Sequence, residues 1–387
     1  MKNSVAIVGV SDLDPKTIAG RSVHSLSTEA IALALADAGL TFADVDGVAT
    51  VGLGGFPATE LAEYLGIRPT WTDSSSAGGS SFEIYVHHAV AAIQAGLCTT
   101  VVVSYGSNQK SARSRRVGGR GMAAGPMPGG PNAQFELPYG FMMPMSPYAL
   151  AARRHMHEFG TTSEQLAEVA VSARQWALKN PKAYRYDAGE LTIDDVLASD
   201  MQSDPLHKLD CCLVTDGGGA VVLTTEDRAR DLDVTPVAIL GTGEAHSHSN
   251  VSQMPDLTRT GSWDSSERAY AMAGVKPADI DVALVYDSFT ITTLLTLEGL
   301  GFCGRGEAGA FVEDGKTRPG GSFPLNTSGG GLSYCHPGMY GIFLLVEAVR
   351  QLRGECGDRQ VDGAQLAIAH GTGGILSSHS TVVLGRS

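Results

Sequence analysis

Three short stretches in the C-terminal part of the chain carry side chains that can give or take a proton. They read YDSFT (286–290), SYCHPGMY (333–340) and AHGTGG (369–374). Their proton-transferring side chains are those of Tyr286, Tyr334, His336, Tyr340 and His370. Phenol and imidazole groups suit general acid–base chemistry rather than nucleophilic attack. Asp287, next to Tyr286, is expected either to orient Tyr286 or to serve a helix end, and both interpretations stay open.

Two other polar patterns in the sequence are candidates for a metal site and a phosphate site. Two His-x-His pairs have no third ligand at a defined spacing, and the six cysteines fall at no zinc spacing, so we expect no metal. The pairs are His155/His157 and His246/His248. An arginine-rich segment contains Arg113, Arg115, Arg116 and Arg120. Because guanidinium groups match phosphate geometry, Arg113 and Arg116 are candidates to bind the phosphates of a ligand, and the alternative is an ordinary surface loop.

The composition is that of a globular protein, with 43% apolar and 18% charged residues among 387. The net charge of -13 argues against a nucleic-acid partner, which would require a basic face. No run of about 18 apolar residues predicts a membrane span. The start, MKNSVAIVGVSDLD, lacks the apolar core and cleavage site of a signal peptide. We therefore expect a cytoplasmic protein with reduced thiols and no membrane partner.

The same pattern occurs twice along the chain and predicts two duplicated halves. In each copy an apolar strand ends in glycine, a helix stops at a glycine, and a second strand follows. The first copy has strands at 5–9 and 47–51 and a helix at 27–38. The second copy has strands at 237–241 and 282–286 and a helix at about 265–273.

Each half continues with a buried helix and another strand. The helices are predicted at 80–96 and 338–354, and the strands at 99–104 and 365–369. This alternation predicts a mainly parallel sheet covered by helices. Two such halves packed together would bury the two central helices between two sheets. We expect an N-terminal half over residues 1–235 and a C-terminal half over residues 236–387.

The N-terminal half also carries an insertion at about residues 107–200. It opens with SNQKSARSRRVGGRGMAAGPMPGGPN, a stretch that suits a lid, a partner surface or a disordered loop. Amphipathic patterns then predict helices at 147–159 and 163–179.

These features resemble the thiolase superfamily, in particular its lipid-transfer-protein-like (SCP2-thiolase) branch. The resemblance covers nearly the whole chain and depends on the order and spacing of five motifs. They are LDCCLVTDGGGAVVLT (209–224), YDSFT (286–290), GFCGRGEAGAFV (301–312), NTSGGGLSYCHPG (326–338) and AHGTGG (369–374). The family implies an α/β fold of five αβαβα layers, a homodimer, and a coenzyme A thioester as substrate, with no tightly bound cofactor.

The nucleophilic cysteine that thiolases carry at the start of the first central helix is absent. Counting back from Gly96 places Gly79 at that position. The neighbouring Ser80 is more typical of a helix cap than of a nucleophile, which would need an adjacent base. By the resemblance, Gly79, Ser80 and Gly373 are candidates to line the coenzyme A thioester site.

The other catalytic positions of the family carry acid–base groups. His370 stands in place of the second family cysteine, and His336 is the family's Gly-His-Pro histidine. Tyr286 stands at an oxyanion-stabilising position, with Tyr334 and Tyr340 nearby. The resemblance thus implies a pocket of proton donors and acceptors without a nucleophile.

Such a pocket favours retro-aldol cleavage of a β-hydroxyacyl-CoA, because hydrogen bonds to a thioester oxygen stabilise the departing enolate. The chain is similar to steroid side-chain-shortening aldolases of the family, which work with a small OB-fold/zinc-ribbon partner protein. By this resemblance Tyr286 is an acid–base candidate, and Tyr334 is the nearest match to a second family tyrosine. The acyl group is expected to be a steroid or another bulky group.

Two alternatives remain at this point. One is a thiolase-type acyltransferase with a displaced nucleophile, for which Cys335 beside His336 is the candidate, although a buried packing cysteine is the simpler interpretation. The other is a non-catalytic acyl-CoA-binding subunit of a complex.

Overall fold

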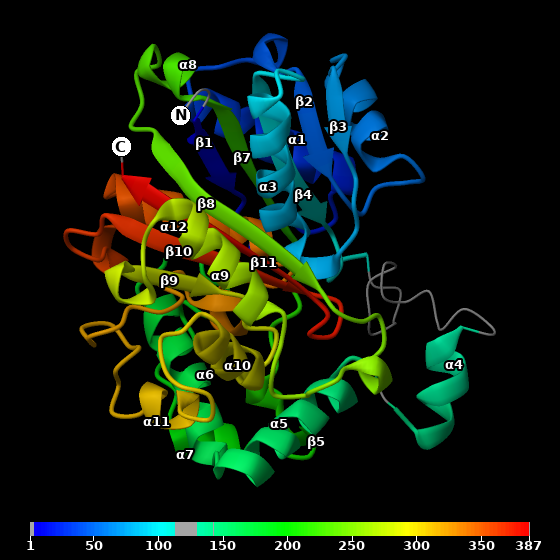
Figure 1. Cartoon of the computed structure of the whole chain (residues 1–387), viewed down its shortest axis with the longest axis vertical. Helices are drawn as coiled ribbons and strands as arrows, with labels where there is room; N and C mark the ends of the chain where they lie inside the picture. The colour runs from blue at the N-terminus through cyan, green and yellow to red at the C-terminus, as the bar shows by residue number, and fades with distance from the viewer. Residues whose placement is uncertain (1–3, 113–129, 142, 387) are drawn as a thin grey trace.

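A large mixed sheet runs through the protein. The computed structural model describes residues 4–112, 130–141 and 143–386, and within them nine strands pair in the order β3-β2-β4-β7-β1-β8-β11-β10-β9 (Figure 1). The strands are β1 (Val5–Asp12), β2 (Gly47–Thr50), β3 (Trp71–Asp73), β4 (Thr100–Ser107), β7 (Gly217–Thr225), β8 (Val237–His246), β9 (Val282–Val285), β10 (Leu366–Gly373) and β11 (Ser378–Arg386). Only Ala6 and Ile7 of β1 pair with β8, so a short ladder joins two half-sheets.

The duplication predicted from the sequence is confirmed. The order β2-β4-β7-β1 in the first half-sheet corresponds to β9-β10-β11-β8 in the second, and each neighbouring pair has the same direction in both halves. The outer helices repeat as well. Gly9 and Gly241 let α1 (Val23–Asp37) and α9 (Ser262–Ala273) approach their strands, since an added Cβ would lie 2.0 Å from Ala34 O or 2.1 Å from Ala269 O.

The prediction of a mainly parallel sheet is wrong. The pairs β3–β2, β2–β4 and β9–β10 are parallel, but β7 and β11 are antiparallel to both of their neighbours. The physical reason is clear at β11, which follows β10 after a four-residue connection at 374–377. A connection that short joins only antiparallel strands, because a parallel return requires a long crossover.

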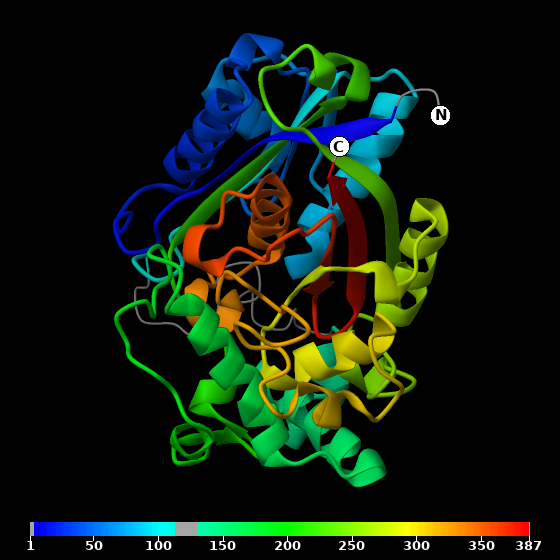
Figure 2. The same ribbon diagram turned by 90° about the vertical axis from the view of Figure 1, so that its left-hand side faces the viewer.

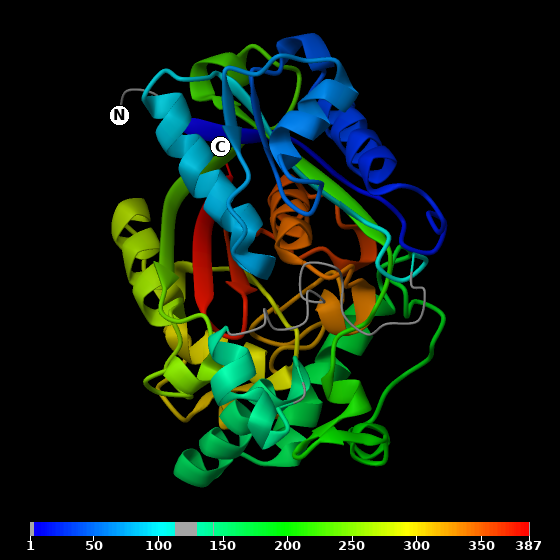
Figure 3. The ribbon, with the colours of Figure 1, turned by 90° about the vertical axis from the view of Figure 1, so that its right-hand side faces the viewer.

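The layers follow from the contacts of the helices, and the expected five-layered αβαβα fold is confirmed. Two central helices, α3 (Ser81–Gln94) and α12 (Gly341–Arg353), pack against each other and against strands of both half-sheets. Figures 2 and 3 show α12, in orange, beside strands of both half-sheets, and Figure 3 shows α3, in cyan, in front of the strands. Helix α1 covers the outer face of the first half-sheet, and α9 covers that of the second, with α10 (Thr290–Gly299) packed on α9.

The insertion forms a helical subregion at the lower end of Figure 1. Its main helices, α5 (Met145–Phe159) and α6 (Ser163–Ala177), lie where the amphipathic patterns predicted them. Thr162 and Gln165 form a capping box that starts α6. Shorter elements are α4 (Pro131–Phe135), α7 (Ile193–Leu197), β5 (Met201–Ser203) and β6 (Leu206–His207). Helix α6 packs on α10 and α11 (Ala308–Val312), so the insertion belongs to the hydrophobic cluster of the C-terminal half.

The remaining helices are α2 (Pro57–Leu65) and α8 (Glu226–Arg230), both beside the first half-sheet. Within the described ranges, no helix has the length and apolar character needed to cross a bilayer.

Candidate active site

Tyr286 and His336 form a buried pair at the end of β9. Tyr286 follows β9 directly, and its backbone N–H donates to His370 O at 3.0 Å. The hydroxyl of Tyr286 lies 2.8 Å from Nε2 of His336. The backbone N–H of His336 donates to Thr215 Oγ1 at 3.1 Å, and this bond holds the histidine against the segment just before β7. Two residues 50 positions apart are thus in direct hydrogen-bond contact.

Burial sets the protonation of this pair. Desolvation raises the pKa of Tyr286 well above its usual value, with smaller contributions from Cys212, Tyr148 and other nearby acids. Burial also lowers the pKa of His336 to about 4. At neutral pH the phenol therefore keeps its proton and the imidazole is neutral, and the Tyr286 hydroxyl donates to His336 Nε2 in the tautomer whose proton is on Nδ1. The pair therefore carries no net charge.

Tyr340 packs against both members of the pair. Its ring meets that of Tyr286 edge-on, with centroids 5.8 Å apart, and stacks beside that of His336 at 6.4 Å. Its hydroxyl is directed elsewhere and lies 3.0 Å from Ser328 Oγ. Tyr340 therefore walls the pair, and its own polar group is occupied by the 326–329 segment.

Three predicted ligand-binding residues meet at the start of the central helix α3. A Cβ added at Gly79 would lie 2.2 Å from Cε2 of Tyr286, so this glycine is in direct contact with the tyrosine ring. A Cβ added at Gly373 would lie 2.6 Å from Ser80 Oγ. Ser80 Oγ itself is 2.8 Å from Ser378 Oγ and within 3.2 Å of Ala77 O. The structure thus brings Gly79, Ser80 and Gly373 to one place beside Tyr286.

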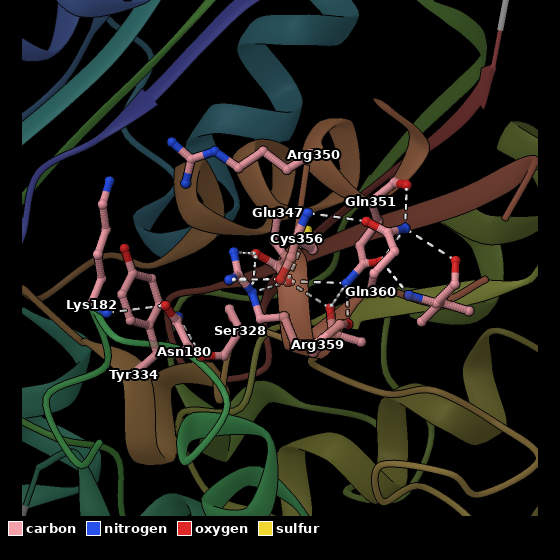
Figure 4. Close-up of polar contacts among 12 residues, drawn as sticks. Asn180, Lys182, Ser328, Tyr334, Glu347, Arg350, Gln351, Cys356, Arg359 and Gln360 are labelled. Carbon is pink, nitrogen blue, oxygen red and sulfur yellow. Dashed lines mark hydrogen bonds and ion pairs between the residues drawn. The ribbon is translucent and has the colours of Figure 1, made fainter. Parts of the chain in front are cut away.

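Tyr334 lies apart from this pair. Its hydroxyl donates to the Asp12 carboxylate, which also forms ion pairs with Lys182 at 2.8 Å and with Arg350 at 2.5 Å. Although burial alone would raise it, the charges of Arg350 and Lys182 hold the pKa of Asp12 well below its usual range. Figure 4 shows Tyr334, Lys182 and Arg350 on one side of a larger polar network. Tyr334 therefore connects β1 to the turn that precedes His336.

The rest of that network anchors the 326–329 segment from α12. Glu347 accepts a hydrogen bond from Thr327 at 2.7 Å and pairs with Arg359 at 3.0 Å (Figure 4). Gln351 Nε2 donates to Thr327 Oγ1 at 3.0 Å. Since Ser328 holds the Tyr340 hydroxyl, these contacts position Tyr340 through the segment.

His370 lies on the other face of the sheet. Its Nδ1 is 2.8 Å from Thr381 Oγ1 and its Nε2 is 3.1 Å from His379 Nδ1. Thr381 in turn contacts Ser265 on the outer helix α9 at 3.0 Å. Successive strand residues point to opposite faces, so the next residue, Gly371, faces the central helices. The structure does not bring the His370 side chain to the Tyr286–His336 pair.

Arg113 and Arg116 lie outside the described residues. Other cations gather around the loop 180–186, which is joined to the site because Tyr184 N–H donates to Tyr334 O at 2.8 Å. Lys110 Nζ sits 4.2 Å from the centre of the Tyr184 ring, and Lys16 Nζ sits 5.6 Å from that of Tyr186. Two lysine ammonium groups therefore lie over the aromatic rings of this loop.

Asp287 serves a helix end, which is one of the two roles expected for it from the sequence, whereas Glu83 was not singled out there. Asp287 accepts the N–H groups of Gly331 at 2.6 Å and Leu332 at 3.2 Å, so it holds the turn that leads to His336. Burial raises its pKa to about 7. Glu83 lies in the first turn of α3, fully buried, and neither carboxyl oxygen has a hydrogen-bond partner among the described residues. A single acid within the apolar stretch FEIYVHHAVAAI was the available signal for Glu83.

Cys335 is fully buried next to His336, and burial raises the pKa of its thiol well above the usual value. Its thiol is therefore protonated at neutral pH. Within the described residues, no three His, Cys, Asp or Glu side chains form a group that could hold a metal ion.

Comparison with known proteins identifies the family of this chain. Residues 15–227 match the family model of the thiolase N-terminal domain, and residues 243–386 match that of a thiolase C-terminal domain-like region. The chain is 37% identical to a 17-hydroxy-3-oxo-4-pregnene-20-carboxyl-CoA lyase of Mycobacterium tuberculosis, with 96% of this chain and 97% of the relative covered. It is 35% identical to an acetyl-CoA acetyltransferase of Methanothermobacter thermautotrophicus, covering 97% and 98%.

A solved structure described as an Ltp2-ChsH2(DUF35) aldolase is also similar, with a TM-score of 0.88, 34% identity, and coverage of 99% of this chain and 98% of that one. Both family models, the full-length relatives and the shared fold agree with the motif order seen in the sequence, and this chain belongs to the thiolase superfamily.

Proposed function

We propose that this protein is a carbon–carbon lyase that cleaves a β-hydroxyacyl-CoA by a retro-aldol reaction. The observation that carries the proposal is the Tyr286–His336 hydrogen bond beside a helix start that holds glycine where a nucleophile would stand. The names of two relatives support it, since one is a steroid carboxyl-CoA lyase and another is a steroid side-chain-cleaving aldolase of Thermomonospora curvata. A bulky, steroid-like acyl group is the substrate class that we propose.

The chemistry uses the pair as a relay. The Tyr286 oxygen accepts the proton of the substrate's β-hydroxyl as its own proton passes to His336 Nε2. The Cα–Cβ bond then breaks, the β-carbon becomes a ketone or aldehyde, and the bonding electrons form the coenzyme A enolate. The same two groups return the proton to the α-carbon, so the cycle needs no net proton and forms no acyl-enzyme. Tyr340, which walls the pair, excludes water from it.

The positions of the predicted residues support a place for coenzyme A. Gly79, Ser80 and Gly373 form the wall beside Tyr286, and we assign the thioester to this place. The cations Lys16 and Lys110 beside the loop 180–186 suit the phosphates of coenzyme A, together with Arg113 and Arg116. Coenzyme A enters as part of the substrate, and the proposal requires no tightly bound cofactor.

A thiolase-type acyltransferase is the second candidate, favoured by the acetyl-CoA acetyltransferase relative. It requires a thiolate that attacks the thioester carbonyl. Cys335 is the cysteine beside His336, and its buried, protonated thiol does not suit that role. A non-catalytic acyl-CoA-binding subunit is the remaining alternative. Turnover by the purified protein would exclude it.

We also propose two protein partners. Among the described strands, β3 pairs with β2 alone and forms an edge of the sheet, with Trp71 on β3 and the exposed Leu97 nearby. We propose this edge as the homodimer contact. The similar aldolase structure is named for two components, which supports a small second protein of the OB-fold/zinc-ribbon type as a partner here. The six free cysteines suit a reducing cytoplasmic environment.

The proposal is tested with the purified chain, alone and with its candidate partner, on 17-hydroxy-3-oxo-4-pregnene-20-carboxyl-CoA, the compound that the relative's name gives. Retro-aldol cleavage yields a ketosteroid and a short acyl-CoA in equal amounts. Release of these two products supports the lyase. Coenzyme A-dependent cleavage of a 3-ketoacyl-CoA, without lyase turnover, would instead establish the acyltransferase.

A further inference from the structure

Two adjacent glycines begin the first central helix, but only one is explained by its backbone. Gly78 has a φ of +71°, in the left-handed region where glycine is favoured. Gly79 is not among the residues with positive φ. Its backbone would accept a side chain, so the reason for glycine at residue 79 must lie in the surrounding space.

The ring of Tyr286 occupies that space. A Cβ at residue 79 would lie 2.2 Å from Cε2 and 2.6 Å from Cζ of Tyr286, and 2.5 Å from the carbonyl oxygen of Thr372. Ordinary contacts between carbon atoms lie at about 3.5–4.0 Å. Even a methyl group at this position therefore forces the tyrosine ring, the Thr372 carbonyl, or both to move.

Tyr286 has little freedom to yield without losing its hydrogen bond. Its backbone N–H is held by His370 O at 3.0 Å, and its ring is enclosed edge-on by His336 at 5.6 Å and by Tyr340 at 5.8 Å. Only 4% of the residue is exposed. Movement of the ring away from residue 79 shifts its hydroxyl relative to His336 Nε2, now 2.8 Å away.

The neighbouring hydroxyl groups do not supply the missing side chain. Ser80 Oγ is engaged with Ala77 O and Ser378 Oγ. Ser81 Oγ donates to Gly78 O at 2.7 Å and accepts from Ala77 N–H at 3.0 Å. Both serines thus satisfy the local backbone of the helix start.

We infer that Gly79 determines which reaction this site performs: its missing side chain admits the Tyr286 ring to His336, so a nucleophile on residue 79 and the Tyr286–His336 pair exclude each other. The inference rests on the proposed function, in which that pair moves the proton. Gly79 acts through Tyr286 and is a positioning residue in this reaction.

The test combines Gly79→Ala, Tyr286→Ala and the double variant. Gly55→Ala is the control, because no atom of the described residues lies within 4 Å of a Cβ there. Gly79→Ala is expected to lower lyase turnover about 100-fold, the order of loss for a misplacement of about 1 Å. Gly55→Ala is expected to keep turnover. Thermal unfolding supplies a readout that is independent of activity.

The double-variant cycle isolates the contact between residue 79 and the ring. Gly79→Ala should lower the unfolding midpoint less when Tyr286 is already alanine, with a partial rescue because the Thr372 carbonyl still crowds residue 79. Additive losses in the midpoint, or a Gly79→Ala variant with wild-type turnover, would overturn the inference. Absence of lyase turnover in the wild-type protein would overturn the proposed function instead, while the unfolding cycle would still report on the exclusion.

Discussion

Replacing Tyr286 by phenylalanine removes a single oxygen from the centre of the site. Within the described part of the chain the hydroxyl has one hydrogen-bond partner, His336 Nε2 at 2.8 Å, and the ring keeps its edge-on contact with Tyr340. The substitution therefore deletes the proton relay while leaving the packing of the ring in place. The effect of the substitution on turnover can therefore be predicted separately from its effect on stability.

The two magnitudes differ greatly. Loss of a positioned acid–base group lowers turnover by about 10²–10⁴-fold. For stability, the buried Nε2 of His336 loses its partner, which costs about 1–3 kcal/mol. A domain whose free energy of unfolding is about 5–15 kcal/mol remains folded after that loss. We therefore expect a folded protein with almost no lyase activity.

The assay is kcat/KM for lyase product release, beside urea unfolding of the same preparations. Tyr270→Phe is the matched control, since Tyr270 is also buried and donates one hydrogen bond, to Leu300 O at 3.0 Å, away from the site. It should lose similar stability and keep its turnover. A Tyr286→Phe variant that turns over within about threefold of wild type would refute the acid–base role of Tyr286.

Three further predictions concern buried ionisable groups. Burial raises the pKa of Glu83, so the folded state keeps a proton that the unfolded state releases above about pH 4.3, and the free energy of unfolding falls as the pH rises. Urea unfolding at pH 5 and pH 8 should therefore show a smaller loss of stability with pH in Glu83→Gln than in the wild type. An equal loss in the two proteins would contradict this prediction. Because the pKa of Asp12 is lowered in the folded state, its ionised carboxylate stabilises the fold above about pH 4, and this stabilisation is lost as the pH falls further. Asp12→Asn leaves Arg350 without its carboxylate and should cost about 3 kcal/mol in unfolding at pH 7, with a flatter acid-unfolding profile; equal stability of the two proteins would argue against the ion pair. Cys335→Ser should retain lyase turnover, because its thiol is buried and protonated, and loss of most activity would favour the displaced-nucleophile acyltransferase.

Several features of the protein were already determined by local sequence. The glycines that stop the two outer helices, Gly39 and Gly274, adopt left-handed φ values of +66° and +71°, so the helix ends could be predicted from residue type alone. The repeated order of strands and helices predicted the duplication and the buried central helices. The lack of a cysteine at residue 79 can likewise be read from the sequence alone.

Other features depended on the tertiary structure. The side chain of His370 faces the outer helix because strand residues alternate between faces, and a shift of one residue would reverse its direction. Tyr334 and Tyr286 both precede His336 in the chain, yet one phenol binds Asp12 and the other binds His336. The contact between Gly79 and the Tyr286 ring joins residues far apart in sequence, and no local pattern encodes such a contact. Residue types and spacing thus determined which groups are available, while long-range packing decided which of them meet.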